Sequence, residues 1–217
     1  MSSGAARLLD RLQALALRLD TRRVLLASGS IIVLLGVLDV LDLVFGSPFG
    51  IFDLNGERNA PATFSAALWT CASVLALLLA RAEQPAAVGR LWQALSALLL
   101  FVGADEFGEV HERLERITGI DWQILYSPVA LVAAVIWVLV GRRLRDRLAG
   151  FGVFVAGTVC GVLSQVIEAV EYGAHDRRVA AFDELVVGEE LLEMSAAVLI
   201  GLALLAALRT VCRQTQA

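Results

Sequence analysis

Residues 24–45 read VLLASGSIIVLLGVLDVLDLVF, an almost uninterrupted apolar run. Asp39 and Asp42 are its only charged residues, and both lie near its C-terminal end. A helix needs about 20 apolar residues to cross the hydrocarbon core of a bilayer, because each residue adds about 1.5 Å of length. The run therefore predicts a transmembrane helix over Val24–Phe45.

Five more apolar runs follow it: Thr63–Leu79, Leu91–Val110, Pro128–Val140, Gly150–Tyr172 and Leu185–Leu208. The fourth run is the shortest, and we expect its helix to begin near Trp122 or Tyr126. Ser127 and Pro128 fit an N-cap and a first helical position, and Pro61 fits the same place in the second helix. The predicted fold class is all-α, a polytopic membrane bundle of about six transmembrane helices.

The composition of the whole chain favours the same class. Of its 217 residues, 58% are apolar and 18% are charged, whereas soluble domains have about 45–50% and about 25%. This length leaves no room for a separate soluble domain beside six spans. The formal net charge of −4 argues against nucleic acid as a partner. The three cysteines match no disulfide or zinc pattern and are expected to be small apolar residues.

The ends of the chain and its arginines predict an orientation. Residues 1–23 predict an amphipathic helix that lies in the headgroup region, residues 24–208 form the six-span domain, and residues 209–217 form a tail. Thirteen of the eighteen arginines fall on the side of the N-terminus. Because basic residues are retained on the cytoplasmic side, we expect both termini to be cytoplasmic and the protein to lie in the cell (inner) membrane.

Acidic residues gather at the opposite, outer side. Only four of the twenty-two fall on the inner side. The rise per residue brings Asp39, Asp105, Glu168 and Glu193 into one layer in the outer third of the membrane. Ionisable side chains at this depth are energetically unfavourable and usually functional. We therefore expect these four carboxylates to surround one interior cavity.

This layer predicts a site for a divalent metal ion. On one continuous helix, Asp105, Glu109 and Glu112 would fall within about 60° of arc. Many carboxylates at low dielectric need cations or protons to compensate their charge. Carboxylates with an imidazole favour Mn, Fe or Zn, and oxygen ligands alone allow Ca or Mg. The candidate ligands are Asp105, Glu109, His111, Glu112, Glu168, Glu171, Glu190 and Glu193. Supporting or alternative residues are Asp39, Asp42, Glu106, Ser164, His175 and Glu189.

A solvent-facing interpretation is open for part of this set. If the third helix leaves the membrane near Val110, Glu109–Arg113 and Glu112–Arg116 are ordinary pairs four residues apart. For Glu115 we favour a solvated position. The outer loop Ser47–Ala60 is either a surface loop with interfacial aromatic residues or a lid over the outer mouth, and we expect the former.

The acidic segments Asp105-Glu106…His111-Glu112, Glu168…Glu171 and Glu189-Glu190…Glu193-Met194 resemble a pattern in uncharacterised multi-spanning bacterial membrane proteins. The resemblance covers the third, fifth and sixth spans. It implies a multi-spanning membrane fold and carries no known activity.

Three functions fit these observations. The first is a membrane protein with an outward-facing metal site, which as an enzyme would act on an amphiphilic or cationic molecule from the outer leaflet. The second is a transporter or channel in which the acidic cluster relays protons or cations. The third is a scaffold or sensor subunit whose acids bind a partner. The sequence predicts no particular oligomer.

Overall fold

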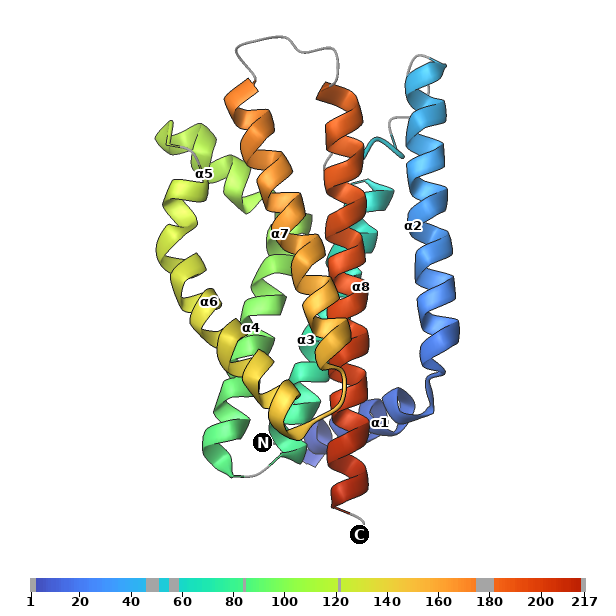
Figure 1. Ribbon diagram of the computed structural model, residues 1–217, viewed down its shortest axis with the longest axis vertical. Helices are drawn as coiled ribbons and strands as arrows, with labels where there is room; N and C mark the ends of the chain where they lie inside the picture. The colour runs from blue at the N-terminus through green and yellow to red at the C-terminus, as the bar shows by residue number, and fades with distance from the viewer. Residues whose placement is uncertain are drawn as a thin grey trace.

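The computed structural model describes residues 3–45, 51–54, 59–83, 85–120, 122–174 and 182–215. Within these ranges every regular element is a helix (Figure 1). The elements are α1 (Ser3–Arg18), α2 (Thr21–Val44), α3 (Ala60–Ala82), α4 (Ala86–Gly108), α5 (Val110–Thr118), α6 (Trp122–Arg147), α7 (Phe151–Ala174) and α8 (Phe182–Gln214). Six of them are long and apolar enough to cross a membrane. The prediction of an all-α polytopic membrane bundle is confirmed.

The bundle is organised around α8, which contacts α2, α3 and α7. Its apolar side chains, among them Ile200, Leu204 and Leu208, are fully buried. They pack with Trp92 and Leu99 of α4 in one continuous core. Both chain ends lie at the same end of the bundle (Figure 1). We call this the arginine-rich end, because it carries Arg81, Arg90, Arg142, Arg145 and Arg209; the opposite end is the acidic end.

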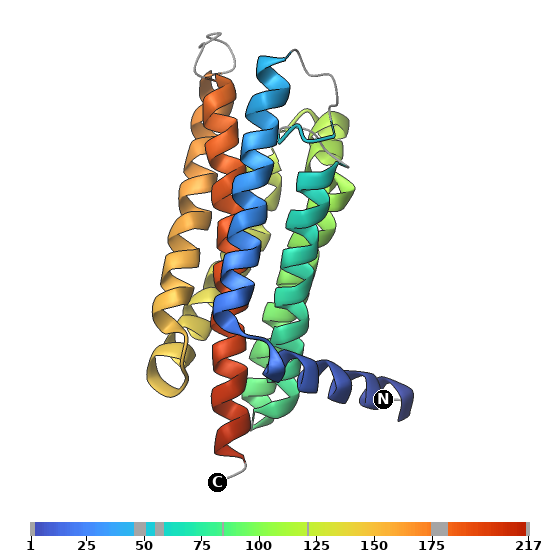
Figure 2. The ribbon, with the colours of Figure 1, turned by 90° about the vertical axis from the view of Figure 1, so that its right-hand side faces the viewer.

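The N-terminal segment is helical, as predicted, but α1 ends at Arg18 and α2 begins at Thr21, three residues before the predicted start of the first span. Figure 2 shows α1 lying crosswise at the foot of the bundle. Ala16 is buried, and Asp10 pairs with Arg81 of α3 at 3.1 Å. These contacts fix α1 against the bundle. Its place in the lipid headgroup region stays a prediction.

The two prolines predicted at helix starts have different positions. Pro61 lies in the first turn of α3, whose N-cap Asn59 accepts a hydrogen bond from Ala62 N at 3.0 Å, so this prediction is confirmed. The fourth predicted span, α6, begins at Trp122, one of its two predicted starts, but Pro128 lies inside it, so the prediction of an N-cap at Ser127 is wrong. Pro128 cannot donate to the Ile124 carbonyl. The Ser127 hydroxyl donates to that oxygen instead, at 2.8 Å, and the helix continues.

The peripheral helix α6 has few buried residues and contacts α4, α5 and α7. In Figure 1 it bows away from α4 and α7 between its two ends. Proline inside a helix is a common cause of such bending. The space behind α6 contains the candidate site.

Candidate functional site

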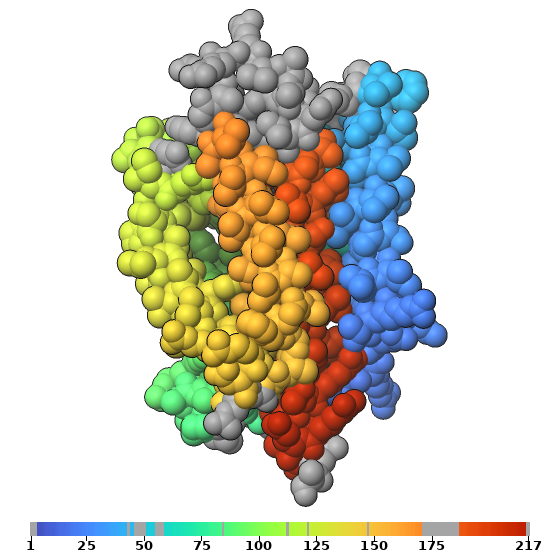
Figure 3. All heavy atoms as spheres, in the orientation of Figure 1, coloured from blue at the N-terminus to red at the C-terminus, as the bar shows by residue number. Residues whose placement is uncertain are grey.

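A cavity of about 1040 Å³ lies between α3, α4, α6, α7 and α8. Figure 3 shows its opening as a hollow between α6 and α7. Apolar side chains make up most of its wall, among them Leu99, Val162 and Ile200. The polar side chains gather towards the acidic end.

Six carboxyl groups line this cavity. They come from three helices: Asp105 and Glu106 from α4, Glu168 from α7, and Glu189, Glu190 and Glu193 from α8. No arginine belongs to the described residues of the wall. The cavity therefore concentrates negative charge in a low-dielectric region, which favours a bound cation or shared protons.

Asp105 organises the corner between α4 and α5. Its carboxylate accepts hydrogen bonds from the His111 backbone N–H and from Tyr126 Oη, both at 3.0 Å. The His111 ring nitrogen Nδ1 lies 3.0 Å from the other carboxylate oxygen. The backbone bond satisfies one of the unpaired N–H groups at the start of α5. A carboxylate on one ring nitrogen orients the imidazole, so its other nitrogen can accept or donate a proton.

Glu168 joins α6 to α7. It accepts hydrogen bonds from Trp122 Nε1 and Gln165 Nε2, each at 2.9 Å. The Trp122 ring contacts the rings of His111 and Tyr126, with centroids 5.2 and 5.5 Å apart. These rings form an aromatic wall beside the carboxylates.

Glu193 is the centre of the acidic group. Glu106 of α4 and Glu168 of α7 line the same cavity and lie close enough for their charges to act on Glu193. Three helices therefore bring carboxyl groups to one part of the cavity.

Trp69 adds an unsatisfied donor to the wall of this cavity. Its side chain is buried, and its indole N–H has no hydrogen-bond partner among the described residues. The Glu193 carboxyl group lies near this N–H group. Buried donors are nearly always satisfied in native proteins. Either the Glu193 carboxyl group or an acceptor on a bound molecule would satisfy this one.

The structure brings five of the eight candidate ligands to the cavity wall: Asp105, His111, Glu168, Glu190 and Glu193. Glu106, Ser164 and Glu189 of the supporting set also line it, and Ser164 donates to Glu189 at 3.1 Å. The side chains of Glu112 and Glu171, and the whole of His175, lie outside the described residues. The role of these residues as metal ligands stays a prediction.

The predicted continuous helix through Asp105, Glu109 and Glu112 is wrong. The chain turns at Glu109, whose φ of 53° is left-handed, and α5 starts in a new direction. The Glu109 carboxylate pairs with Arg113 at 3.8 Å and Arg116 at 3.5 Å and does not line the cavity. Glu109–Arg113 is thus the ordinary helix pair that the alternative interpretation allowed.

Asp39 and Asp42 also lie outside the cavity wall, so the prediction that Asp39 shares the cavity is wrong. Both are buried. The Asp39 carboxylate accepts a hydrogen bond from Leu54 N at 2.9 Å. This bond holds the segment Ile51–Leu54 against the bundle, and Leu54 itself reaches the cavity wall. Leu54 therefore packs inward, whereas Ile51 and Asp53 are exposed, and most of the loop Ser47–Ala60 lies outside the described residues, so the surface-loop expectation stays a prediction.

The described ranges contain no group of three or more His, Cys, Asp or Glu side chains that could hold a metal ion. The carboxylates are instead distributed over hydrogen bonds with Tyr126, Trp122, Gln165 and Ser164. The arrangement is that of a wide acidic cavity.

Sequence reasoning missed the aromatic residues of this wall, above all Trp69, Trp122 and Tyr126. Their residue type could have predicted them, because buried tryptophan and tyrosine usually need hydrogen-bond partners for their N–H and O–H groups, and carboxylates are suitable acceptors. Each of these residues lies on a helix that faces a predicted acidic segment.

One known family matches most of this chain: DUF8692, a domain of unknown function, matches residues 31–208. The chain belongs to the DUF8692 family. The DUF8692 match begins within α2 and ends within α8, so it contains every described residue of the cavity wall. Helix α1 precedes it. No curated protein and no solved structure matches the chain.

Proposed function

We propose that this DUF8692 protein binds an amphiphilic organic cation in the acidic cavity. The proposal rests on one observation. Six carboxyl groups line a cavity of about 1040 Å³, and none of the described residues in its wall is an arginine. An ammonium group would compensate part of this negative charge. Its apolar body would replace lipid or water along the rest of the wall.

The size and lining of the cavity favour an organic ligand. Small-molecule sites usually have volumes of about 300–1,000 Å³, mostly apolar walls and a few convergent polar groups. The opening between α6 and α7 lies along the two spans, so an amphiphile could enter sideways from the bilayer. The faces of Trp122 and Tyr126 would add cation–π attraction for a quaternary or primary ammonium group.

Glu193 is the residue whose change tests this proposal. Protein in zwitterionic lipid discs would be titrated with dodecyltrimethylammonium or with dodecanol, and tryptophan fluorescence would report binding. We expect Glu193→Gln to weaken binding of the ammonium compound at least about tenfold, since a hydrogen bond or contact to a charged group contributes about 1.5–3 kcal/mol.

The matched control is Glu115→Gln, which removes a carboxylate that does not line the cavity. This variant should bind like the wild type. Equal affinity for dodecanol and the ammonium compound, or unchanged affinity in Glu193→Gln, would reject a charge-selective site.

A second candidate is a divalent metal ion, which as part of an enzyme would act on an amphiphilic substrate. The observation that favours it is that Asp105, His111, Glu168, Glu190 and Glu193, five of the predicted ligands, all line the cavity. Metal content of the same purified proteins distinguishes the two candidates. A stoichiometric metal that is lost in Glu168→Ala and Glu193→Ala, but kept in Glu115→Ala, would favour the metal.

We also propose that the arginine-rich end faces the cytoplasm of a cell membrane, as the arginine distribution supports. Reporter fusions after Arg81, Arg145 and Ala217 should then read cytoplasmic, and fusions near Asn55, Ile120 and Asp176 external. If the C-terminal reporter were external, the proposed orientation would be wrong and the acidic end would face the cytoplasm.

A further inference from the structure

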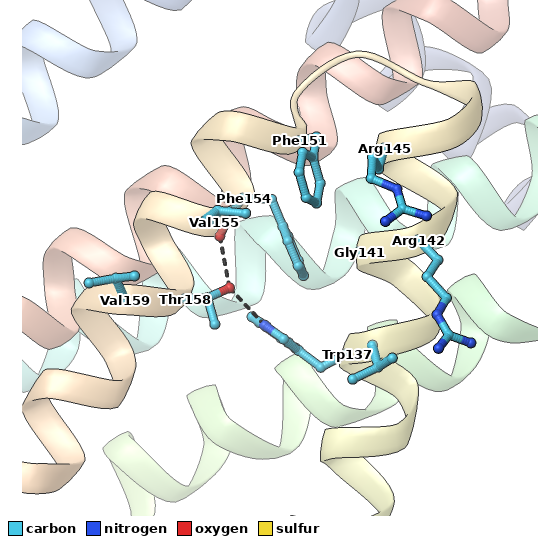
Figure 4. A pocket seen from close by; sticks show the side chains of 10 residues that line it. Trp137, Gly141, Arg142, Arg145, Phe151, Phe154, Val155, Thr158 and Val159 are labelled. Atoms are coloured by element: carbon cyan, nitrogen blue, oxygen red, sulfur yellow. Dashed lines mark hydrogen bonds between the residues drawn. The ribbon is translucent and has the colours of Figure 1, made fainter.

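A second, smaller hollow lies between α6 and α7 towards the arginine-rich end. It has a volume of about 300 Å³ and is lined by Trp137, Phe151, Phe154, Val155, Val159 and neighbouring residues (Figure 4). We call it the α6–α7 groove. Trp137, Val138 and Thr158 also reach the acidic cavity, so the two spaces adjoin.

The floor of the groove presents apolar surface. The rings of Trp137 and Phe154 are in contact, with centroids 4.9 Å apart. Trp137 Nε1 donates to Thr158 Oγ1, which donates to the Phe154 carbonyl, each at 2.8 Å (Figure 4). Because these polar atoms satisfy one another, the floor offers a ligand dispersion and apolar contact only.

Two arginines form one rim of the groove. Arg142 and Arg145 are one helical turn apart on α6, and both line the groove (Figure 4). Arg145 Nε donates to Asp146 at 2.8 Å, and Arg142 has no carboxylate partner among the described residues. The adjacent Arg143 differs, because it pairs with Glu83. The rim therefore carries positive charge beside an apolar groove.

We propose that the α6–α7 groove binds an anionic phospholipid. Val138, Val155 and Val159 are each about half exposed, at 53%, 42% and 51%, on the surface of two membrane spans, where acyl chains are the surrounding solvent. The guanidinium groups of Arg142 and Arg145 bind the phosphate, and one acyl chain lies along the aromatic floor. Basic pockets between transmembrane helices at a membrane surface are typical sites for anionic headgroups. This ligand has the opposite charge to the one proposed for the cavity.

Binding of phosphatidylglycerol to the detergent-solubilised full chain, measured by native mass spectrometry, tests this proposal. We expect the double variant Arg142→Gln/Arg145→Gln to bind it about 30-fold more weakly, since each basic side chain near an anionic lipid surface contributes about fivefold. Phosphatidylcholine should bind weakly to the wild type and to the variant alike.

The matched control is Arg22→Gln/Arg23→Gln, which removes two exposed arginines at the same end but outside the groove. It should keep phosphatidylglycerol affinity within about twofold, because bound lipid contacts only the groove. Equal losses in the two double variants, or equal affinity of the wild type for both lipids, would reject the site.

A second variant, Val155→Trp, tests the apolar part without changing charge. A large side chain at this half-exposed position fills the groove, so lipid affinity should fall while the melting temperature is unchanged. Glycerol 3-phosphate, the headgroup without chains, should fail to displace the lipid at equal concentration. If glycerol 3-phosphate displaced the lipid fully, or if Val155→Trp bound lipid as well as the wild type, the proposal would be rejected. The arginines would then form an anion site that needs no acyl chain.

Discussion

Replacing Arg143 by methionine should destabilise the protein by about 3 kcal/mol, the lower part of the range for a broken buried ion pair. Arg143 Nε donates to Glu83 Oε1 at 2.7 Å, and Trp92 Nε1 donates to Glu83 Oε2 at 2.6 Å. The Glu83 side chain is only 6% exposed. Without Arg143, its carboxylate would stay buried with one hydrogen bond and no counter-charge, which is the origin of the loss.

The measurement is thermal unfolding of detergent-solubilised protein. A loss of about 3 kcal/mol corresponds to a fall of about 6–12 °C in Tm for a chain of this length. The exposed Arg90 at the same end is the control, and Arg90→Met should change Tm little. Adding Glu83→Gln to Arg143→Met should restore most of the loss, because it removes the uncompensated charge. If the double variant were less stable than Arg143→Met alone, the ion pair would not be the cause.

Gly150→Ala is the second change with a large expected effect, about 3 kcal/mol or more. Gly150 joins α6 to α7 with a φ of 99°, where a side chain adds strain of about 1–3 kcal/mol. A Cβ atom there would lie 2.6 Å from the Ala203 carbonyl oxygen in α8. Backbone cannot move aside as a flexible side chain would, so overpacking adds a further cost of about 1–3 kcal/mol.

Two other glycines separate these contributions in the same unfolding assay. Gly119 also has a positive φ, 65°, but a Cβ would meet no atom within 4 Å, so Gly119→Ala should show the backbone strain alone. Gly152 is helical with open space around it, and Gly152→Ala should be neutral or stabilise by about 0.5–1 kcal/mol. Equal effects at Gly150 and Gly119 would mean that the close approach to Ala203 is unimportant.

These contacts explain how α6 forms the outer wall of the cavity. At the arginine-rich end, Arg143 binds Glu83, and at the acidic end Trp122 and Tyr126 bind Glu168 and Asp105. Between these ends α6 is mostly exposed and bends past Pro128. A helix held at both ends and loosely packed in its middle allows sideways access to the cavity behind it.

The sequence alone determined the number and approximate position of the spans. Apolar length is a local property, because each backbone polar group in a membrane must be satisfied within its own helix. The N-cap Asn59 and Pro61 could be predicted from neighbouring residues for the same reason. Rise per residue also predicted that Asp105, Glu168 and Glu193 lie at similar heights on their helices, and these three line one cavity.

Tertiary structure alone decided which acids meet. Glu109 does not share a helix face with Asp105, because its own left-handed backbone turns the chain there. The Asp105 carboxylate, which accepts from the His111 backbone N–H, stabilises the start of the next helix. Asp39 does not line the cavity, because its carboxylate accepts a hydrogen bond from Leu54 N in the segment between α2 and α3. Conversely, Glu106 reached Glu193, 87 positions away. Depth is fixed by distance along one helix, whereas the direction of a side chain depends on how helices rotate and pack, and the hydrogen bonds that decide this join residues remote in sequence.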